Sequence, residues 1–132
     1  MDNYPPSKTP IKVTVSSDLE PVKGEGFITE RDDGFTVEFN LLRDKFTIEH
    51  SVAVTRIVTE GDMSYTIELC EAQTSTVLAT PYGAVRFAVK TLERTVERMY
   101  DKLHIILKYI LASEAAGELE RSIIMEVEKV SK

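Results

Sequence analysis

Few side chains in this sequence have the types and spacing that catalytic chemistry requires. His50 and His104 are the only histidines and Cys70 is the only cysteine, so the sequence contains no zinc-site spacing. We therefore expect neither a metal nor a cofactor. A pair formed by Cys70 and His50 would supply a nucleophile and its base. We favour the simpler interpretation, a half-exposed histidine on a strand and a small buried cysteine.

Arg56 is the residue whose position is most suggestive of a site. It occupies every second position together with Val52, Val54 and Val58, so these side chains share one face of a strand, which we predict to be the buried face. A buried charge is costly unless it is paired and hydrogen-bonded. Two solutions are open, a carboxylate on another strand or an anionic ligand, and we favour the internal ion pair. Loss of a buried pair would cost about 2–4 kcal/mol of stability.

Two further arginines raise the same question less strongly. They are Arg86 and Arg121, and the second shares a predicted face with Ile123 and Met125. Arg121 lies near the start of a predicted strand, where its side chain can extend to solvent. An arginine inside the fold would orient a carboxylate or phosphate by forked hydrogen bonds. The residues that we expect to bind a ligand are Arg56, Arg86, Tyr82, Tyr109 and His50.

The segment Thr80-Pro81-Tyr82-Gly83 has the composition of a corner. Pro81 fixes its own φ angle and has no N–H donor, and Gly83 allows the backbone to bend. We favour a structural role for this segment. The alternative is that Tyr82 lies on the rim of a cavity.

The composition predicts one soluble globular domain. The chain has 132 residues, of which 42% are hydrophobic and 29% charged, and a formal net charge of −6. This charge, with its scattered cations, argues against nucleic acid and anionic membranes as partners. The apolar runs are too short to span a bilayer, and the first residues lack the features of a secretory signal. The single cysteine forms no internal disulfide, so we expect a cytoplasmic protein.

Alternation of apolar and polar residues dominates the first two-thirds of the sequence. Alternation marks strands with one buried face, and turn signals such as Asp32-Asp33-Gly34 and Glu60-Gly61-Asp62 separate them. Many short strands at close spacing predict an antiparallel β-sandwich or barrel. We expect residues 1–10 to be a flexible lead-in and residues 11–131 to form the domain.

Residues 92–112 fit two patterns. Leu92, Val96, Met99, Leu103 and Ile106 recur at steps of four and three, which is the pattern of an amphipathic helix. Residues 103–111 also alternate with a period of two, which is the pattern of a strand. Periodicity alone leaves the two structures open.

A resemblance favours the strands. The stretches that carry it are, in order, Val52–Arg56, Thr80–Gly83 with Thr91, Ile105–Tyr109 and Ser122–Val127, and they span most of residues 10–130. They resemble the YwiB-like family, bacterial proteins with a calycin-like, lipocalin-like β-barrel. The resemblance implies strands at 84–92, 94–101 and 102–112, and hence an all-β antiparallel barrel of about eight to ten strands. It implies no reaction.

A barrel of this size either fills with its own side chains or holds one small ligand. Our leading hypothesis is a non-enzymatic protein that binds a small, partly apolar molecule inside the barrel. The alternative is a filled barrel that acts as a structural or interaction module and forms a homodimer. A small hydrolase or isomerase, built on Arg56, His50 and a tyrosine, is the third hypothesis.

Overall fold

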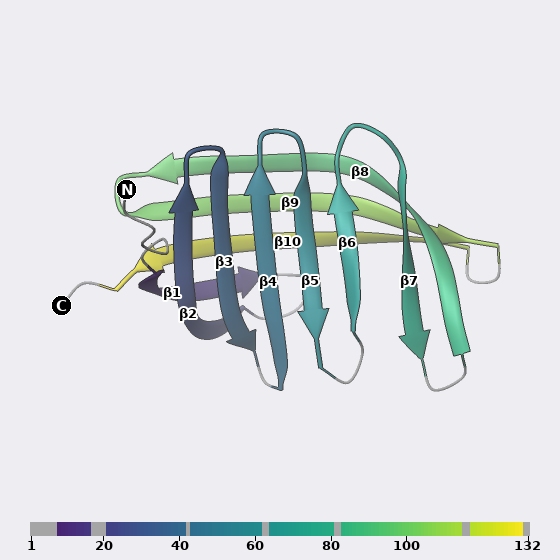
Figure 1. Cartoon of the computed structure of the whole chain (residues 1–132), viewed down its shortest axis with the longest axis horizontal. Coiled ribbons are helices and arrows are strands. Elements are labelled where there is room, and N and C mark those ends of the chain that lie inside the picture. The colour runs from purple at the N-terminus through teal and green to yellow at the C-terminus, as the bar shows by residue number, and fades with distance from the viewer. Residues whose placement is uncertain are drawn as a thin grey trace, which may run out of the picture.

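Ten antiparallel β-strands, joined in one sheet that curls into a nearly closed barrel, make up the described part of the chain (Figure 1). The computed structural model describes residues 8–16, 21–41, 43–61, 64–80, 83–114 and 117–130. The strands are β1 (Lys8–Ser16), β2 (Val22–Arg31), β3 (Gly34–Leu41), β4 (Asp44–Ser51), β5 (Thr55–Glu60), β6 (Tyr65–Leu69), β7 (Thr74–Thr80), β8 (Gly83–Met99), β9 (Lys102–Ser113) and β10 (Gly117–Lys129). Their order in the sheet is β6-β5-β4-β3-β2-β1-β10-β9-β8-β7. Among these residues there is no helix that could cross a membrane.

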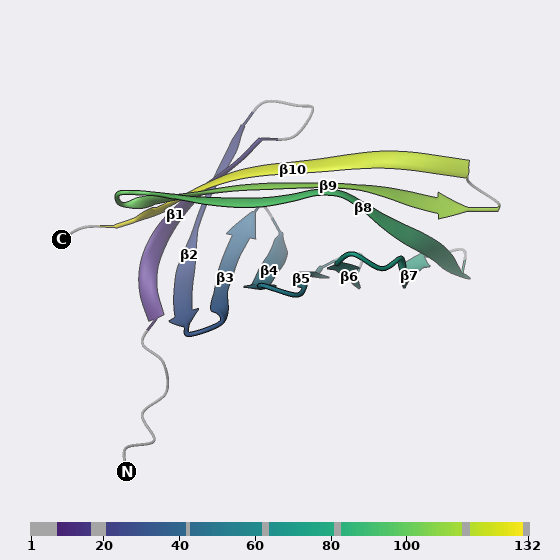
Figure 2. The same cartoon turned by 90° about the horizontal axis from the view of Figure 1, so that it is seen from above.

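The sheet folds into two layers, which Figure 2 shows from above. The long strands β8, β9 and β10 form one layer, and β2 to β7 cross it as the other. Strand β8 belongs to both, because its first half pairs with β7 and its second half with β9. A bulge between Thr91 and Glu93 lies within this strand. Bulges bend a strand and increase its twist, so β8 can pass from one layer to the other.

Apart from the turn at Tyr100 and Asp101, residues 92–112 are strand and not helix, as the resemblance implied. Leu103, Ile105, Leu107 and Tyr109 alternate into the core as successive buried positions of β9. The two strands implied at 84–92 and 94–101 are one continuous strand, and the break between them coincides with its bulge. At the other end, β1 begins at Lys8, so residues 8–10 belong to the sheet and not to a flexible lead-in.

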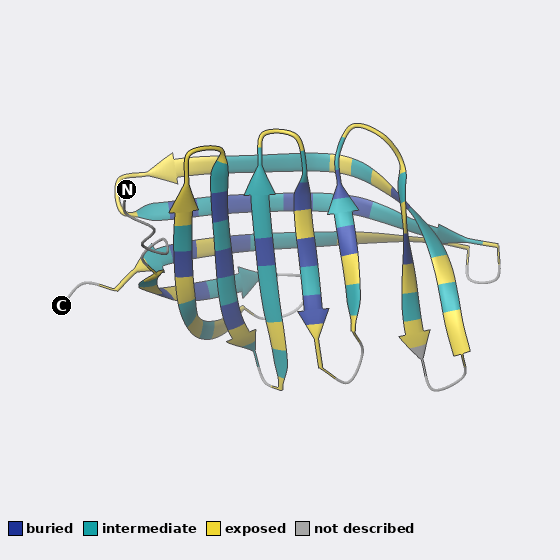
Figure 3. Ribbon diagram, in the orientation of Figure 1, coloured by how far each residue is buried: buried dark blue, intermediate teal, exposed yellow. Residues whose placement is uncertain are grey.

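The core lies between the two layers. Inward positions of neighbouring strands are buried in rows, which appear as dark bands in Figure 3. Phe35, Val37 and Phe39 of β3 face the interior, as their alternation predicted. The Asp32-Asp33-Gly34 turn also forms where predicted, between β2 and β3. One-sided apolar alternation is therefore enough to fix the inward face of this hairpin.

Strands β6 and β7 are the two ends of the sheet, and they meet at a seam. No backbone ladder joins them within the described part of the chain. Instead, the Thr74 hydroxyl donates to the Glu68 carbonyl at 2.7 Å, and the Thr76 hydroxyl donates to the Thr66 carbonyl at 2.6 Å. Side-chain hydroxyls thus close the barrel where main-chain hydrogen bonds stop.

Candidate functional site

A cavity of about 400 Å³ opens between the two layers of the barrel. Most of its lining is apolar and comes from inward positions of strands in both layers. The apolar lining residues are Val15, Phe39, Leu41, Phe46, Ile48, Ile57, Ile123 and Met125, and the polar ones are Tyr65, Tyr109, Arg121 and Ser122. Two other hollows, of about 600 and 670 Å³, have several charged side chains of both signs in their lining besides apolar ones, whereas Arg121 is the one charged residue that lines this cavity. The interior cavity is therefore the candidate binding site.

Tyr109 and Arg121 form the polar part of the cavity. They are cross-strand partners on β9 and β10, and both lie on the inward face. Tyr109 is buried, with 3% of its surface exposed, whereas Arg121 is exposed to solvent. Tyr65, on β6 in the opposite layer, also lines the cavity and interacts electrostatically with Tyr109. The cavity thus combines an apolar body with one polar region that reaches solvent.

Burial controls the ionisation of Tyr109. It raises the pKa of the phenol to about 12, and the neighbouring Tyr65 acts in the same direction. The charge and hydrogen bond of Arg121 lower the pKa by less. The phenol is therefore protonated at neutral pH and can donate a hydrogen bond.

Thr59 is a second polar group on the interior face. Its side chain is buried, and its hydroxyl has no hydrogen-bond partner among the residues that the structure describes. It lies on β5 between Phe46 and Tyr65, its cross-strand partners on β4 and β6, both of which line the cavity. A buried hydroxyl without a partner costs about 1–3 kcal/mol, so its position beside the cavity is notable.

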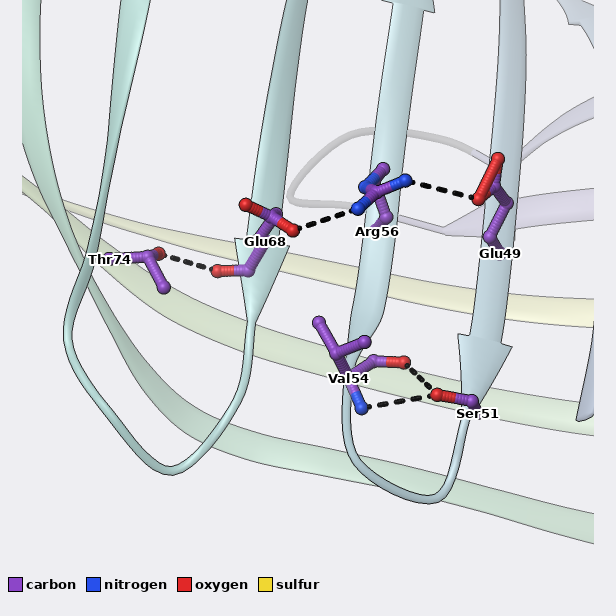
Figure 4. A network of polar contacts seen from close by, with 6 residues as sticks. All are labelled: Glu49, Ser51, Val54, Arg56, Glu68 and Thr74. Atoms are coloured by element: carbon purple, nitrogen blue, oxygen red, sulfur yellow. Dashed lines mark hydrogen bonds and ion pairs between the residues drawn. The ribbon is translucent and has the colours of Figure 1, made fainter. Parts of the chain in front are cut away.

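The prediction that Arg56 is buried is wrong. Arg56 points outward, and 44% of its side chain is exposed. Figure 4 shows it between Glu68, at 3.0 Å, and Glu49, at 3.5 Å. These three residues are cross-strand neighbours on β6, β5 and β4. The ion pair that we favoured for Arg56 does exist, with two carboxylates on the adjacent strands. The cluster lies on the outer surface, however, and not in the interior.

The turn between β4 and β5 explains the error. Ser51 and Val54 close this turn through main-chain and hydroxyl hydrogen bonds, and Val52 lies on it with 86% of its surface exposed. The run from Val52 to Val58 therefore includes a turn, and alternation cannot be continued through it. Strand β5 begins at Thr55 and buries that residue with Ile57 and Thr59. Thr55 and Thr59 are buried while Val58 on the other face is only half-buried, so the inward and outward faces are the reverse of those expected.

His50 takes part in a hydrogen-bonded cluster at the end of the barrel away from Tyr109. Its Nδ1 lies 2.8 Å from the Thr55 hydroxyl, and its ring stacks on Phe35. Arg94 of β8 donates to the Thr55 hydroxyl at 3.2 Å and to the carbonyls of Ser51 and Val52 at 2.9 and 2.7 Å. Arg94 therefore fastens β8 to the β4–β5 turn.

The remaining candidates do not converge on one site. Arg86 is exposed on β8 and does not line the cavity, and Tyr82 lies outside the described residues. Cys70 is half-buried and donates to the Ala72 carbonyl at 3.4 Å, while His50 bonds to Thr55. Arg56 and His50 both line an open hollow of about 280 Å³ at the β4–β5 turn, together with Glu49 and Ser51. None of the described tyrosines lines this hollow, so the hydrolase or isomerase built on Arg56, His50 and a tyrosine stays a hypothesis. In the described ranges no cluster of potential metal ligands is found.

Sequence reasoning therefore located part of the site and missed the rest. Tyr109 was expected and lines the cavity, and Arg121 shared the predicted inward face with Ile123 and Met125. Tyr65 gave no signal of its own, because it occupies one position of an alternating strand. The sequence did not indicate that Arg94 faces inward, because the bulge in β8 shifts the inward positions of the strand. Thr91 faces inward before the bulge, and Arg94 faces inward after it.

Comparison with known structures supports the fold. The crystal structure of the ywiB protein from Bacillus subtilis matches this chain with a TM-score of 0.76, covering 94% of each chain at 15% sequence identity. No protein-family profile and no curated protein sequence matches the chain. At this identity, the likeness concerns the fold alone. The chain therefore has the YwiB-like fold, the all-β antiparallel barrel that the sequence resemblance implied.

Proposed function

We propose that this protein binds a small, partly apolar molecule in the cavity between its two layers, without transforming it. The observation that carries the proposal is the cavity itself, about 400 Å³ in volume and lined mainly by apolar side chains with one polar region. Small-molecule sites in proteins have this size and character. The free thiol of Cys70 is compatible with the reducing, cytoplasmic compartment that we propose.

Burial of apolar surface supplies the driving force. Each square ångström removed from water contributes about 25 cal/mol. Phe39, Phe46 and Ile57 offer such surface from one layer, and Ile123 and Met125 offer it from the other. Ordering the ligand offsets part of this gain. The cavity favours this proposal over a filled barrel that acts as an interaction module. A homodimer stays a prediction, tested by the mass of the protein in solution.

A neutral fluorescent probe, N-phenyl-1-naphthylamine, tests the proposal without involving charge recognition. The sequence has no tryptophan, so a single introduced tryptophan changes the cavity and adds a local reporter. Ile123→Trp places an indole at a lining position of β10. Ile124→Trp is the matched control, because Ile124 follows directly on the other face of the strand and does not line the cavity.

We expect the wild-type protein and Ile124→Trp to bind the probe saturably, with enhanced fluorescence, and Ile123→Trp to bind it much more weakly. Thermal melts of both variants check that each is folded. Native mass spectrometry of freshly purified protein provides a second measurement, because a natural ligand adds a discrete mass. Equal loss of binding in the two variants, or no saturable binding by the wild type, would contradict the interior site.

A further inference from the structure

We propose that the natural ligand is an amphipathic monocarboxylate, whose apolar body fills the cavity and whose carboxylate binds Arg121 and Tyr109. This inference rests on the proposed function and names the class of molecule bound. Neither residue was recognised from the sequence as half of a pair. The structure makes them cross-strand partners that face the same cavity.

The first step of the argument is charge. Arg121 is the single charged residue among those lining the cavity. Within the described part of the chain, the ion pairs engage other cations, including Arg56, Arg98 and Lys129, and none involves Arg121. A guanidinium beside an apolar cavity, with no carboxylate of the described residues bound to it, is suited to an anionic ligand group.

The second step is the supply of neutral donors. Burial keeps the pKa of Tyr109 high, at about 12, so its hydroxyl carries a proton that it can donate. Tyr65 approaches Tyr109 from the other layer and lines the same cavity. A carboxylate has two oxygens and several lone-pair positions. One oxygen can therefore accept from Arg121 and the other from Tyr109.

The third step concerns Thr59. Its hydroxyl is buried on the interior face beside Tyr65 and has no partner in the described part of the chain. This polar atom is independent of the Tyr109–Arg121 pair and lies on a different strand. Thr59 is not among the residues that line the cavity, so the polar group of this layer that a ligand reaches is its cross-strand neighbour Tyr65.

The number of cations favours a carboxylate over a phosphate. The cavity supplies one guanidinium, which balances the single charge of a carboxylate and matches its planar geometry in a bidentate pair. A phosphate monoester carries close to two negative charges at neutral pH, so it would leave about one charge unbalanced here. The apolar lining, which includes Phe46 and Ile57, then excludes small, fully polar acids.

Three probes with the same eight-carbon body separate these possibilities: octanoate, octanamide and octyl phosphate. Their affinities are measured by calorimetry and by displacement of N-phenyl-1-naphthylamine. The variants are Arg121→Gln, Arg121→Lys and Tyr109→Phe. Arg86→Gln is the matched control, because it removes one exposed arginine of β8 that does not line the cavity.

We expect the wild type to prefer octanoate over both other probes by at least about tenfold, the scale of one charge-assisted interaction. Arg121→Gln should weaken octanoate by a similar factor and leave octanamide within about twofold. Arg121→Lys should fall between the two, because it keeps the charge and loses the fork. Tyr109→Phe should weaken octanoate about threefold to tenfold, and Arg86→Gln should bind like the wild type.

The outcomes that overturn the proposal are distinct from failure of the cavity hypothesis. If the neutral naphthylamine binds and octanoate shows no preference over octanamide, the carboxylate class is wrong and interior binding stands. An Arg121-dependent preference for octyl phosphate also overturns the carboxylate class. Equal weakening by Arg86→Gln and Arg121→Gln overturns the assignment of Arg121. If neither the naphthylamine nor any octyl probe binds the wild type, both proposals fail.

Discussion

At the scale of single residues, Arg56 and Arg94 contribute to the structure in different ways. Arg56 joins two carboxylates on the outer face of β5, where water and salt screen the ion pairs. Arg94 reaches from β8 to the opposite layer and donates to Thr55 and to the carbonyls of Ser51 and Val52. Loss of Arg94 would leave three oxygen acceptors without their donor at a partly buried junction. Loss of Arg56 would leave two carboxylates that water can hydrate.

We expect Arg56→Ala to lower the free energy of unfolding by less than about 1 kcal/mol, because exposed ion pairs contribute little. Arg94→Ala should lower it by about 1–3 kcal/mol, through the loss of charge-assisted hydrogen bonds between layers. Urea melts of the two variants make the comparison. A larger effect of Arg56→Ala than of Arg94→Ala would show that the surface cluster is the more important of the two.

His50 makes stability depend on pH. Burial, and then the nearby charge of Arg94, lower the pKa of His50 below its ordinary value of 6.5. The unfolded chain therefore takes up a proton before the folded protein does, and stability falls as the pH drops below about 6.5 until the lowered pKa is passed. Because Arg94 can only donate to Thr55, the Thr55 hydroxyl is free to donate to His50 Nδ1, and protonation of that nitrogen removes this bond.

We expect the free energy of unfolding to decrease between about pH 7 and pH 5, and His50→Asn to lose most of that decrease. Asparagine keeps an acceptor for the Thr55 hydroxyl and has no proton to gain in this range. Urea melts at several pH values measure both slopes. The same slope in the two proteins would exclude His50 as the source.

At the scale of elements, the seam between β6 and β7 distinguishes this barrel from one with a continuous ladder. Two unpaired strand edges invite pairing with other chains, but here the two edges face each other. Thr74 and Thr76 of β7 donate their hydroxyls to carbonyls of β6. Threonine therefore serves two purposes in β7, since it is also a good strand former.

Thr76→Val should destabilise the protein by about 1–2 kcal/mol, because the isosteric side chain fits but no longer donates to the Thr66 carbonyl. Thr76 is buried, with 6% of its surface exposed, so water does not readily replace the bond. Ser75→Ala is the control, since Ser75 is the exposed neighbour on the other face. Thermal melts in which both variants match the wild type would mean that the hydroxyl does not hold the seam.

At the scale of the whole molecule, the two layers differ in how their backbone is paired. Strand β9 lies between β8 and β10 and has a ladder on each side over most of its length. Strands β6 and β7 each have a ladder on one side only within the described residues. Cooperative opening begins where fewest backbone hydrogen bonds must break.

Hydrogen exchange measures this difference directly. We expect amides of residues 103–109 in β9 to exchange slowest, and amides of β6 and β7 to exchange fastest among the strands. Thr76→Val should accelerate exchange in β6 and β7 more than in β9. Uniform protection across all strands would indicate that the barrel opens only as one unit.

The sequence by itself determined the type and most of the positions of the strands. Alternation in residues 35–41, with an Asp-Asp-Gly turn before it, was sufficient because one face is apolar and the turn is tight. The resemblance placed residues 92–112 in strands against a helical pattern. It also implied the barrel, which the match to the ywiB structure supports.

Only the tertiary structure decided which charged residues face the interior. Alternation separates the two faces of a strand, but it does not show which face is inward when both carry β-branched residues. Strand β5 is such a case, with Thr55 and Thr59 on one face and Val58 on the other. The bulge in β8 shifts the inward position between Thr91 and Arg94, and no local pattern encodes that shift. Nor does sequence spacing reveal that Tyr109 and Tyr65 meet from opposite layers, because the curvature of the whole sheet brings them together.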